Sequence, residues 1–175
     1  MNRYLLWFLV VFSVLLRFLP HGWNISPVVA IGLFCGAYLP LRWALVIPLI
    51  SMTAGDILLG WVPINLFGET AILLSVLIGS SLRNKRSVWR IIGASVAGST
   101  LFFFISNFGV WFLGCSPGWY PPTMTGLLHC YAAGIPFYRN TMMGDLLYTG
   151  SLFGTFELLT RGIFRRSQVK VAVSK

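Results

Sequence analysis

Long apolar runs separated by short polar breaks dominate the hydropathy pattern of this chain. Candidate membrane-crossing helices cover 4–19, 26–39, 43–61, 64–82, 91–114 and 141–160. A helix needs about 20 predominantly apolar residues to cross the hydrocarbon of a bilayer, so 26–39 is short for a full crossing. The pattern predicts an all-α integral membrane protein: one domain over 1–163, built as a bundle of about six transmembrane helices, and a basic cytoplasmic tail at 164–175.

One stretch between the last two predicted spans is harder to interpret. Residues 115–140 contain several Pro and Gly residues, which favour loops, yet 124–137 is moderately apolar. We expect 115–140 to lie outside the membrane, with 124–137 as a re-entrant or interfacial segment. Pro48 and Pro136 would kink or break a helix, which a membrane protein tolerates where a cavity is lined. Whether 26–39 and 124–137 span or re-enter remains open at this stage.

Composition supports the membrane assignment. The 175 residues are 57% hydrophobic and only 10% charged, with a mean hydropathy of +0.80. Soluble domains carry roughly 25% charged residues. A chain of this length could not bury so much apolar surface within a single water-soluble core.

The basic residues predict the orientation. The net charge of +9 comes from groups placed between apolar runs: Arg83, Lys85, Arg86 and Arg90 in one loop, and further Arg and Lys residues in the tail. Cytoplasmic loops are enriched in Lys and Arg, so six spans predict a multi-pass protein of the cell (inner) membrane with both termini in the cytoplasm. The charge pattern does not form one basic face, and we expect no nucleic-acid partner.

The polar and charged residues that do not belong to the basic loop or tail fall mostly at a common depth, near the outer ends of the predicted spans. Ionisable groups inside a membrane normally face a bundle interior or a wet cavity. We therefore predict an outward-facing ligand pocket, in which arginine would bind a carboxylate or phosphate and Asp and Asn would orient polar groups. In the alternative, Arg17 and Arg139 only neutralise Asp56 and Asp145. The candidate ligand-binding residues are Arg17, Asn24, Asp56, Asn107, Trp111, Arg139, Asn140 and Asp145.

Two GxxxG patterns predict close helix contacts. Gly32 and Gly36 lie in the second span, and Gly150 and Gly154 lie in the sixth. Small residues let membrane helices approach closely, either within one bundle or between subunits. The three cysteines and two histidines show no metal-ligand spacing, so we expect no metal and no cofactor.

Several short blocks along the chain carry a family resemblance: RFLPH (17–21), NISPV (24–28), GLFCG (32–36), GDILLG (55–60), SNFGVW (106–111), PFYRNT (136–141) and GDL (144–146). From residue 17 to 154 the chain resembles an uncharacterised family of small bacterial membrane proteins. That family in turn resembles the substrate-binding S components of energy-coupling-factor (ECF) vitamin transporters. This resemblance implies a six-helix S-component-like fold, a bound vitamin or related nutrient, a transmembrane coupling subunit and cytoplasmic ATPases. The first span lacks the Ala-x-x-x-Ala motif common in S components.

The leading hypothesis is therefore a non-enzymatic membrane component that binds or transports a small molecule. A structural or assembly subunit without a ligand is the main alternative. A third hypothesis is an intramembrane aspartyl peptidase, because Gly55-Asp56 and Gly144-Asp145 repeat a Gly-Asp pair, although both lack the first glycine of Gly-x-Gly-Asp. A proton-coupled variant of transport is also open. The sequence does not define the ligand, the energy source or the oligomeric state.

Overall fold

Helices form the whole regular structure of the described residues. The computed structural model describes residues 3–16, 25–59, 65–114 and 120–173, and beyond Thr160 it describes the backbone alone. The helices in chain order are α1 (Arg3–Leu16), α2 (Val28–Tyr38), α3 (Leu41–Leu59), α4 (Asn65–Ser80), α5 (Val88–Leu113) and α6 (Met124–Val173). The expectation of an all-helical fold is confirmed over these residues.

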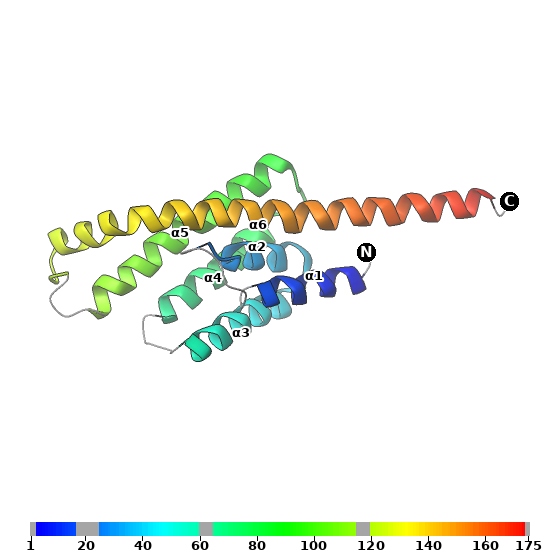
Figure 1. Ribbon diagram of the computed structural model, residues 1–175. Coiled ribbons are helices and arrows are strands. Elements are labelled where there is room, and N and C mark those ends of the chain that lie inside the picture. Colours follow the sequence, from blue (N-terminus) through cyan, green and yellow to red (C-terminus); the bar gives the residue numbers. More distant parts are fainter. Residues whose placement is uncertain (1–2, 17–24, 60–64, 115–119, 174–175) are drawn as a thin grey trace.

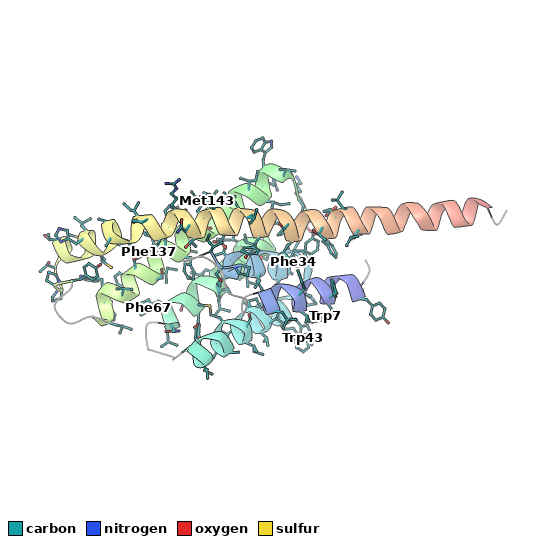
Figure 2. All side chains as sticks on the ribbon, viewed as in Figure 1. Trp7, Phe34, Trp43, Phe67, Phe137 and Met143 are labelled. Carbon is teal, nitrogen blue, oxygen red and sulfur yellow. The ribbon has the colours of Figure 1, made fainter. Side chains whose placement is uncertain are left out.

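Helix α2 is the centre of the bundle (Figure 1). All eleven of its residues are buried, and it contacts each of the other five helices. Its sequence is apolar all round, and such a helix is expected to be covered on every side. Phe34 of α2 packs edge-on against Phe153 and Phe156 of α6, with ring centroids 5.4 and 5.7 Å away (Figure 2).

Two glycines let α2 pack directly on the backbone of α4. A Cβ atom at Gly32 would collide with Ser75 Oγ, and one at Gly36 would collide with the carbonyl oxygen of Val76. Close approach of this kind is what small residues provide between membrane helices. The first GxxxG pattern therefore serves packing within the chain.

Helix α6 is longer than the sequence predicts. It runs without a break over 50 residues, with Pro136 inside it. In Figure 1 it extends along the whole bundle and beyond it on the side of both termini. The expected outer loop at 115–140 is wrong from residue 124 onward, because 124–137 is the first part of the sixth helix. The same helix continues through Val173 into the predicted basic tail.

Contacts with α5 hold the early part of α6 in helical form. Tyr131 donates a hydrogen bond from its hydroxyl to the carbonyl oxygen of Phe104 at 3.1 Å, and Cys130 Sγ donates to the carbonyl oxygen of Asn107 at 3.4 Å. Proline removes one backbone donor from a helix, which local sequence alone treats as a break. Here the tertiary contacts outweigh that local cost.

Helix length distinguishes the elements further. Among the described residues, α5 is the one helix whose length of 26 residues and apolar composition are by themselves sufficient to cross a bilayer. Helices α2 and α4 are apolar but shorter. At 1.5 Å per residue, the eleven residues of α2 extend over about 16 Å, roughly half of a 30 Å hydrocarbon core.

Candidate ligand-binding cavity

The site begins at the buried N-terminus of α2. The N-cap residue, Pro27, makes no side-chain capping hydrogen bond. Asp145 of α6 is 0% exposed, and its carboxyl group faces the backbone N–H groups of Val29 and Ala30 in the first turn of α2. Because helix N-termini carry partial positive charge and unsatisfied donors, a carboxylate from another helix can act as the cap.

The glycine before Asp145 explains how α6 reaches this position. A Cβ atom at Gly144 would lie 3.0 Å from Cγ2 and 3.2 Å from Cα of Ile25, in the segment that leads into α2. The Gly-Asp pair therefore combines a close backbone approach with an acidic side chain at the same level.

The two oxygens of the Asp145 carboxyl differ in their surroundings. Ser99 of α5 donates a hydrogen bond to Oδ2 at 2.7 Å. Oδ1 is buried and has no hydrogen-bond partner of good geometry among the described residues. A buried polar atom left in this state calls for an explanation, such as a ligand or an ion.

A cavity of about 300 Å³ adjoins Asp145, between the start of α2, the C-terminal half of α5 and the first part of α6. This volume is at the lower end of the range for small-molecule sites. The described lining residues are Ser26, Val28, Val29, Phe102, Phe103, Ser106, Asn107, Val110, Gly134, Phe137, Tyr138, Thr141 and Asp145. The wall is mainly apolar and aromatic, with a few polar side chains.

Two of the eight residues expected at the site line this cavity. Asn107 comes from α5 and Asp145 from α6, although 37 other residues separate them in sequence. Arg17 and Asn24, both expected in the pocket, lie outside the described residues.

The structure places the other four candidates elsewhere. Asp56 is 6% exposed on α3, and it is not among the described lining residues. Trp111 donates its indole N–H to the carbonyl oxygen of Pro121 at 3.0 Å and so ties the end of α5 to the segment before α6. Arg139 is exposed and Asn140 is half-buried; neither lines the cavity.

Four polar lining residues were missed by the sequence reasoning. Ser26 belongs to the NISPV block, Ser106 precedes Asn107 in the SNFGVW block, and Tyr138 and Thr141 belong to the PFYRNT block. All three blocks carried the family resemblance. The sequence prediction instead chose Arg139 because of its charge. Arg139 directly follows Tyr138 on the helix, and adjacent helical residues point in different directions.

The remaining acids connect helices outside the cavity. Thr53 of α3 donates to Glu69 Oε1 of α4 at 2.8 Å. Glu157 of α6 accepts a hydrogen bond from Tyr38 at 3.2 Å and lies 3.9 Å from Arg86 Nε. In the described part of the chain, no three His, Cys, Asp or Glu residues gather as a metal site.

A second hollow runs between α5 and α6 at the basic end of the bundle. Its volume is about 860 Å³, and Ile92, Leu146, Gly150, Phe153 and Gly154 contribute to its wall. A Cβ atom added at Gly150 or Gly154 would meet no atom within 4 Å. The second GxxxG pattern is therefore open among the described residues, in contrast to the first.

Comparison with known proteins identifies the family. Residues 1–169 match the model of a family described as "Family of unknown function (DUF6580)". The match covers nearly the whole chain, and the chain belongs to this family. The expectation of an uncharacterised family is thereby confirmed. No curated protein and no solved structure matches the chain.

Proposed function

We propose that this protein is a multi-pass membrane component that binds a small molecule in the cavity beside Asp145. Two features together support the proposal. The cavity has a volume of about 300 Å³, and the carboxyl group of Asp145 beside it is fully buried. One oxygen of that carboxyl group has no well-aligned hydrogen-bond partner among the described residues. Ligand sites typically combine an apolar wall with a few convergent polar groups. Asn107 and Asp145 are predicted from the sequence as ligand-binding residues, and both line the cavity.

The exposed surface supports a membrane setting. Large apolar side chains point outward along α5 and α6, where Phe104 is 50% exposed, Leu128 60% and Leu147 65%. Monomeric soluble proteins rarely expose contiguous apolar surface of this extent. Lys and Arg residues instead gather in the α4–α5 connection, where Asn84, Lys85 and Arg86 are exposed. Lipid contact along the sides and cytoplasm at the basic end account for both patterns.

The cavity lies in the opposite half of the bundle from the basic loop. Its α5 lining residues fall between 102 and 110, whereas α5 starts beside the basic loop at Val88. With that loop in the cytoplasm, the cavity belongs to the outer leaflet. The non-helical residues just before α2 border it, and irregular backbone at membrane depth is tolerated where it lines a cavity or is buried in protein.

Within this proposal the protein acts as the ligand-binding part of a nutrient transporter. The resemblance to S components of energy-coupling-factor transporters suggests a transmembrane coupling subunit and cytoplasmic ATPases as partners, without catalysis by this chain. Six helices with both termini in the cytoplasm give the matching topology.

A cavity-filling variant tests the binding function. Native mass spectrometry of the protein purified in mild detergent should show a reproducible added mass that Val110→Phe removes, because Val110 lines the cavity. Val46→Phe is the matched control, since Val46 is 41% exposed on α3. If the added mass is absent from the wild type, or survives in Val110→Phe, the binding proposal fails.

The second candidate function is an assembly subunit, favoured by the hollow between α5 and α6. The open face at Gly150 and Gly154 and the volume of about 860 Å³ would suit a partner helix. Gly150→Leu should then abolish co-purification of a membrane partner, while Ser151→Leu, on a neighbouring exposed position, should not. Unchanged co-purification in Gly150→Leu would exclude this surface.

A further inference from the structure

The hydroxyl groups in the cavity wall have their hydrogens engaged in their own helices. Ser106 Oγ donates to the carbonyl oxygen of Phe102 at 2.7 Å, and Thr141 Oγ1 donates to the carbonyl oxygen of Phe137 at 3.1 Å. A hydroxyl has a single hydrogen and two lone pairs. Once the hydrogen is used, only acceptor capacity remains available to a ligand.

The same reasoning applies to the neighbouring tyrosine and asparagine. Thr100 Oγ1 donates to the carbonyl oxygen of Val96 at 2.7 Å. The hydroxyl of Tyr138, 2.8 Å from Thr100 Oγ1, is therefore the donor of that pair. Asn107 Nδ2 donates to the carbonyl oxygen of Phe103 at 2.8 Å. Because a carbonyl oxygen only accepts, this bond orients the amide: it leaves Asn107 Oδ1 as an acceptor and the second N–H of Nδ2 as a donor.

Asp145 is the one acidic side chain among the described lining residues, and none of them is basic. Its described neighbours, Ser99 and the N–H groups of Val29 and Ala30, are all donors. They surround a carboxyl group that acts as an acceptor. Among the described residues, the free donors of the wall are the hydroxyl of Ser26 and the second N–H of Asn107. The oxygen acceptors of Ser106, Asn107, Tyr138, Thr141 and Asp145 outnumber them.

Aromatic rings complete the wall. Phe102, Phe103, Phe137 and Tyr138 all line the cavity, and the rings of Phe103 and Tyr138 lie with centroids 4.8 Å apart. The face of an aromatic ring carries partial negative charge and attracts cations. The aromatic rings and the oxygen acceptors therefore both favour a positively charged ligand.

We infer that the cavity takes a small organic cation that carries N–H donors, such as a protonated amine or an amidinium group on an apolar body. The inference rests on the proposed binding function and names its ligand class. It departs from the sequence expectation of a carboxylate or phosphate ligand, which relied on arginine. Arg139 is exposed away from the cavity, and no described lining residue is a Lys or Arg. An anion would therefore find mostly lone pairs and ring faces.

Two probes with one body and opposite charge test the inference. Phenethylammonium and 3-phenylpropanoate are titrated by calorimetry into the protein in lipid nanodiscs, with empty nanodiscs as the blank. We expect saturable binding of the ammonium, and binding of the propanoate at least about tenfold weaker, the scale of a single hydrogen bond to a charged group. Equal or tighter binding of the propanoate overturns the inference, as does absence of ammonium binding.

Substitutions of two lining residues test whether the ammonium probe binds in the cavity. Asp145→Asn should weaken ammonium binding by about tenfold or more, because it removes the charge and keeps the shape. Since Asp145 also caps α2, Thr141→Val provides a second variant that removes an uncharged acceptor and should weaken binding by about threefold. Thr160→Val is its matched control, because Thr160 bonds its own helix in the same way outside the cavity. Unaltered affinity in both Asp145→Asn and Thr141→Val overturns the assignment.

The ligand-binding function and the cationic nature of the ligand are tested by different signals. A co-purified mass that Val110→Phe removes, together with no ammonium binding, retains a ligand cavity and overturns the cation. Absence of both signals overturns the cavity function itself.

Discussion

Asp145 and Arg83 lie at opposite ends of the same buried helix, the carboxyl group at the start of α2 and the guanidinium group at its end. Arg83 donates from Nε to the carbonyl oxygen of Gly36 at 2.9 Å and from Nη2 to that of Leu39 at 2.7 Å. A helix is partially positive at its N-terminus and negative at its C-terminus. Each side chain thus has the sign that its helix end favours. In the proposed membrane setting, these caps replace the water that a short central helix cannot reach.

Replacing Arg83 should destabilise the bundle. Arg83→Gln would leave carbonyl groups at the end of α2 without their charged donor, at a cost of about 1–3 kcal/mol in the free energy of unfolding. Thermal unfolding in detergent measures the effect. Lys85→Gln is the control, since Lys85 is exposed in the same loop and its loss changes the net charge equally. A drop in melting temperature no larger than that of Lys85→Gln would contradict the capping role.

The hydrogen bond from Ser99 to Asp145 should also contribute to stability. Ser99 is 0% exposed, and Ser99→Ala removes the donor to a buried carboxyl oxygen, for a loss of about 1–2 kcal/mol. Ser151→Ala is a matched control, because Ser151 is an exposed serine that bonds only within α6 in the described structure. Equal melting temperatures for the two variants would show that the Ser99 bond adds nothing.

The two GxxxG patterns should respond in opposite ways to an added methyl group. Gly36→Ala would force α2 away from the backbone of α4, with a loss of about 1–3 kcal/mol. An alanine Cβ at Gly154 would meet no atom within 4 Å, so Gly154→Ala should stabilise the purified protein by up to about 1 kcal/mol, because alanine is the better helix former. Chemical or thermal unfolding of both variants measures the two changes in the free energy of unfolding. Tolerance of alanine at Gly36 would disprove the close α2–α4 contact.

Single-cysteine labelling tests the proposed orientation. In a background where the three native cysteines are replaced by alanine, Thr123→Cys should react with a membrane-impermeant maleimide in intact cells. Asn84→Cys, in the basic loop, should react only after permeabilisation, because Lys- and Arg-rich loops stay in the cytoplasm. Both positions are exposed in the structure. The reverse labelling pattern would invert the topology and place the cavity in the inner leaflet.

Much of the secondary structure could be predicted from apolar runs. The predicted spans at 26–39, 43–61 and 64–82 differ by only a few residues from α2, α3 and α4, because uninterrupted apolar sequence bounded by polar or Pro residues has few other stable forms. The start of α6 could not be predicted in this way. Pro136 signals a break locally, and only contacts with α5, such as that of Tyr131, keep the helix continuous.

The candidate site was predictable in part. Asn107 and Asp145 stood out because polar residues are rare in apolar helices and tend to mark sites. Ser106, Tyr138 and Thr141 did not stand out, since hydroxyl groups are common in membrane helices and bond their own backbone. Which side of α6 faces the cavity depends on how the helix rotates against α5, and that is a property of packing.

By itself the sequence determined that the chain is helical and apolar, where most helices begin and end, and which rare polar residues deserve attention. These properties follow from local periodicity and composition. Tertiary structure alone decided that Gly32 and Gly36 pack inside while Gly150 and Gly154 stay open, that Asp145 and Arg83 cap one helix, and that Arg139 faces away from the cavity. Such relationships join residues far apart in sequence, and they depend on the relative position and rotation of whole helices, which no local pattern encodes.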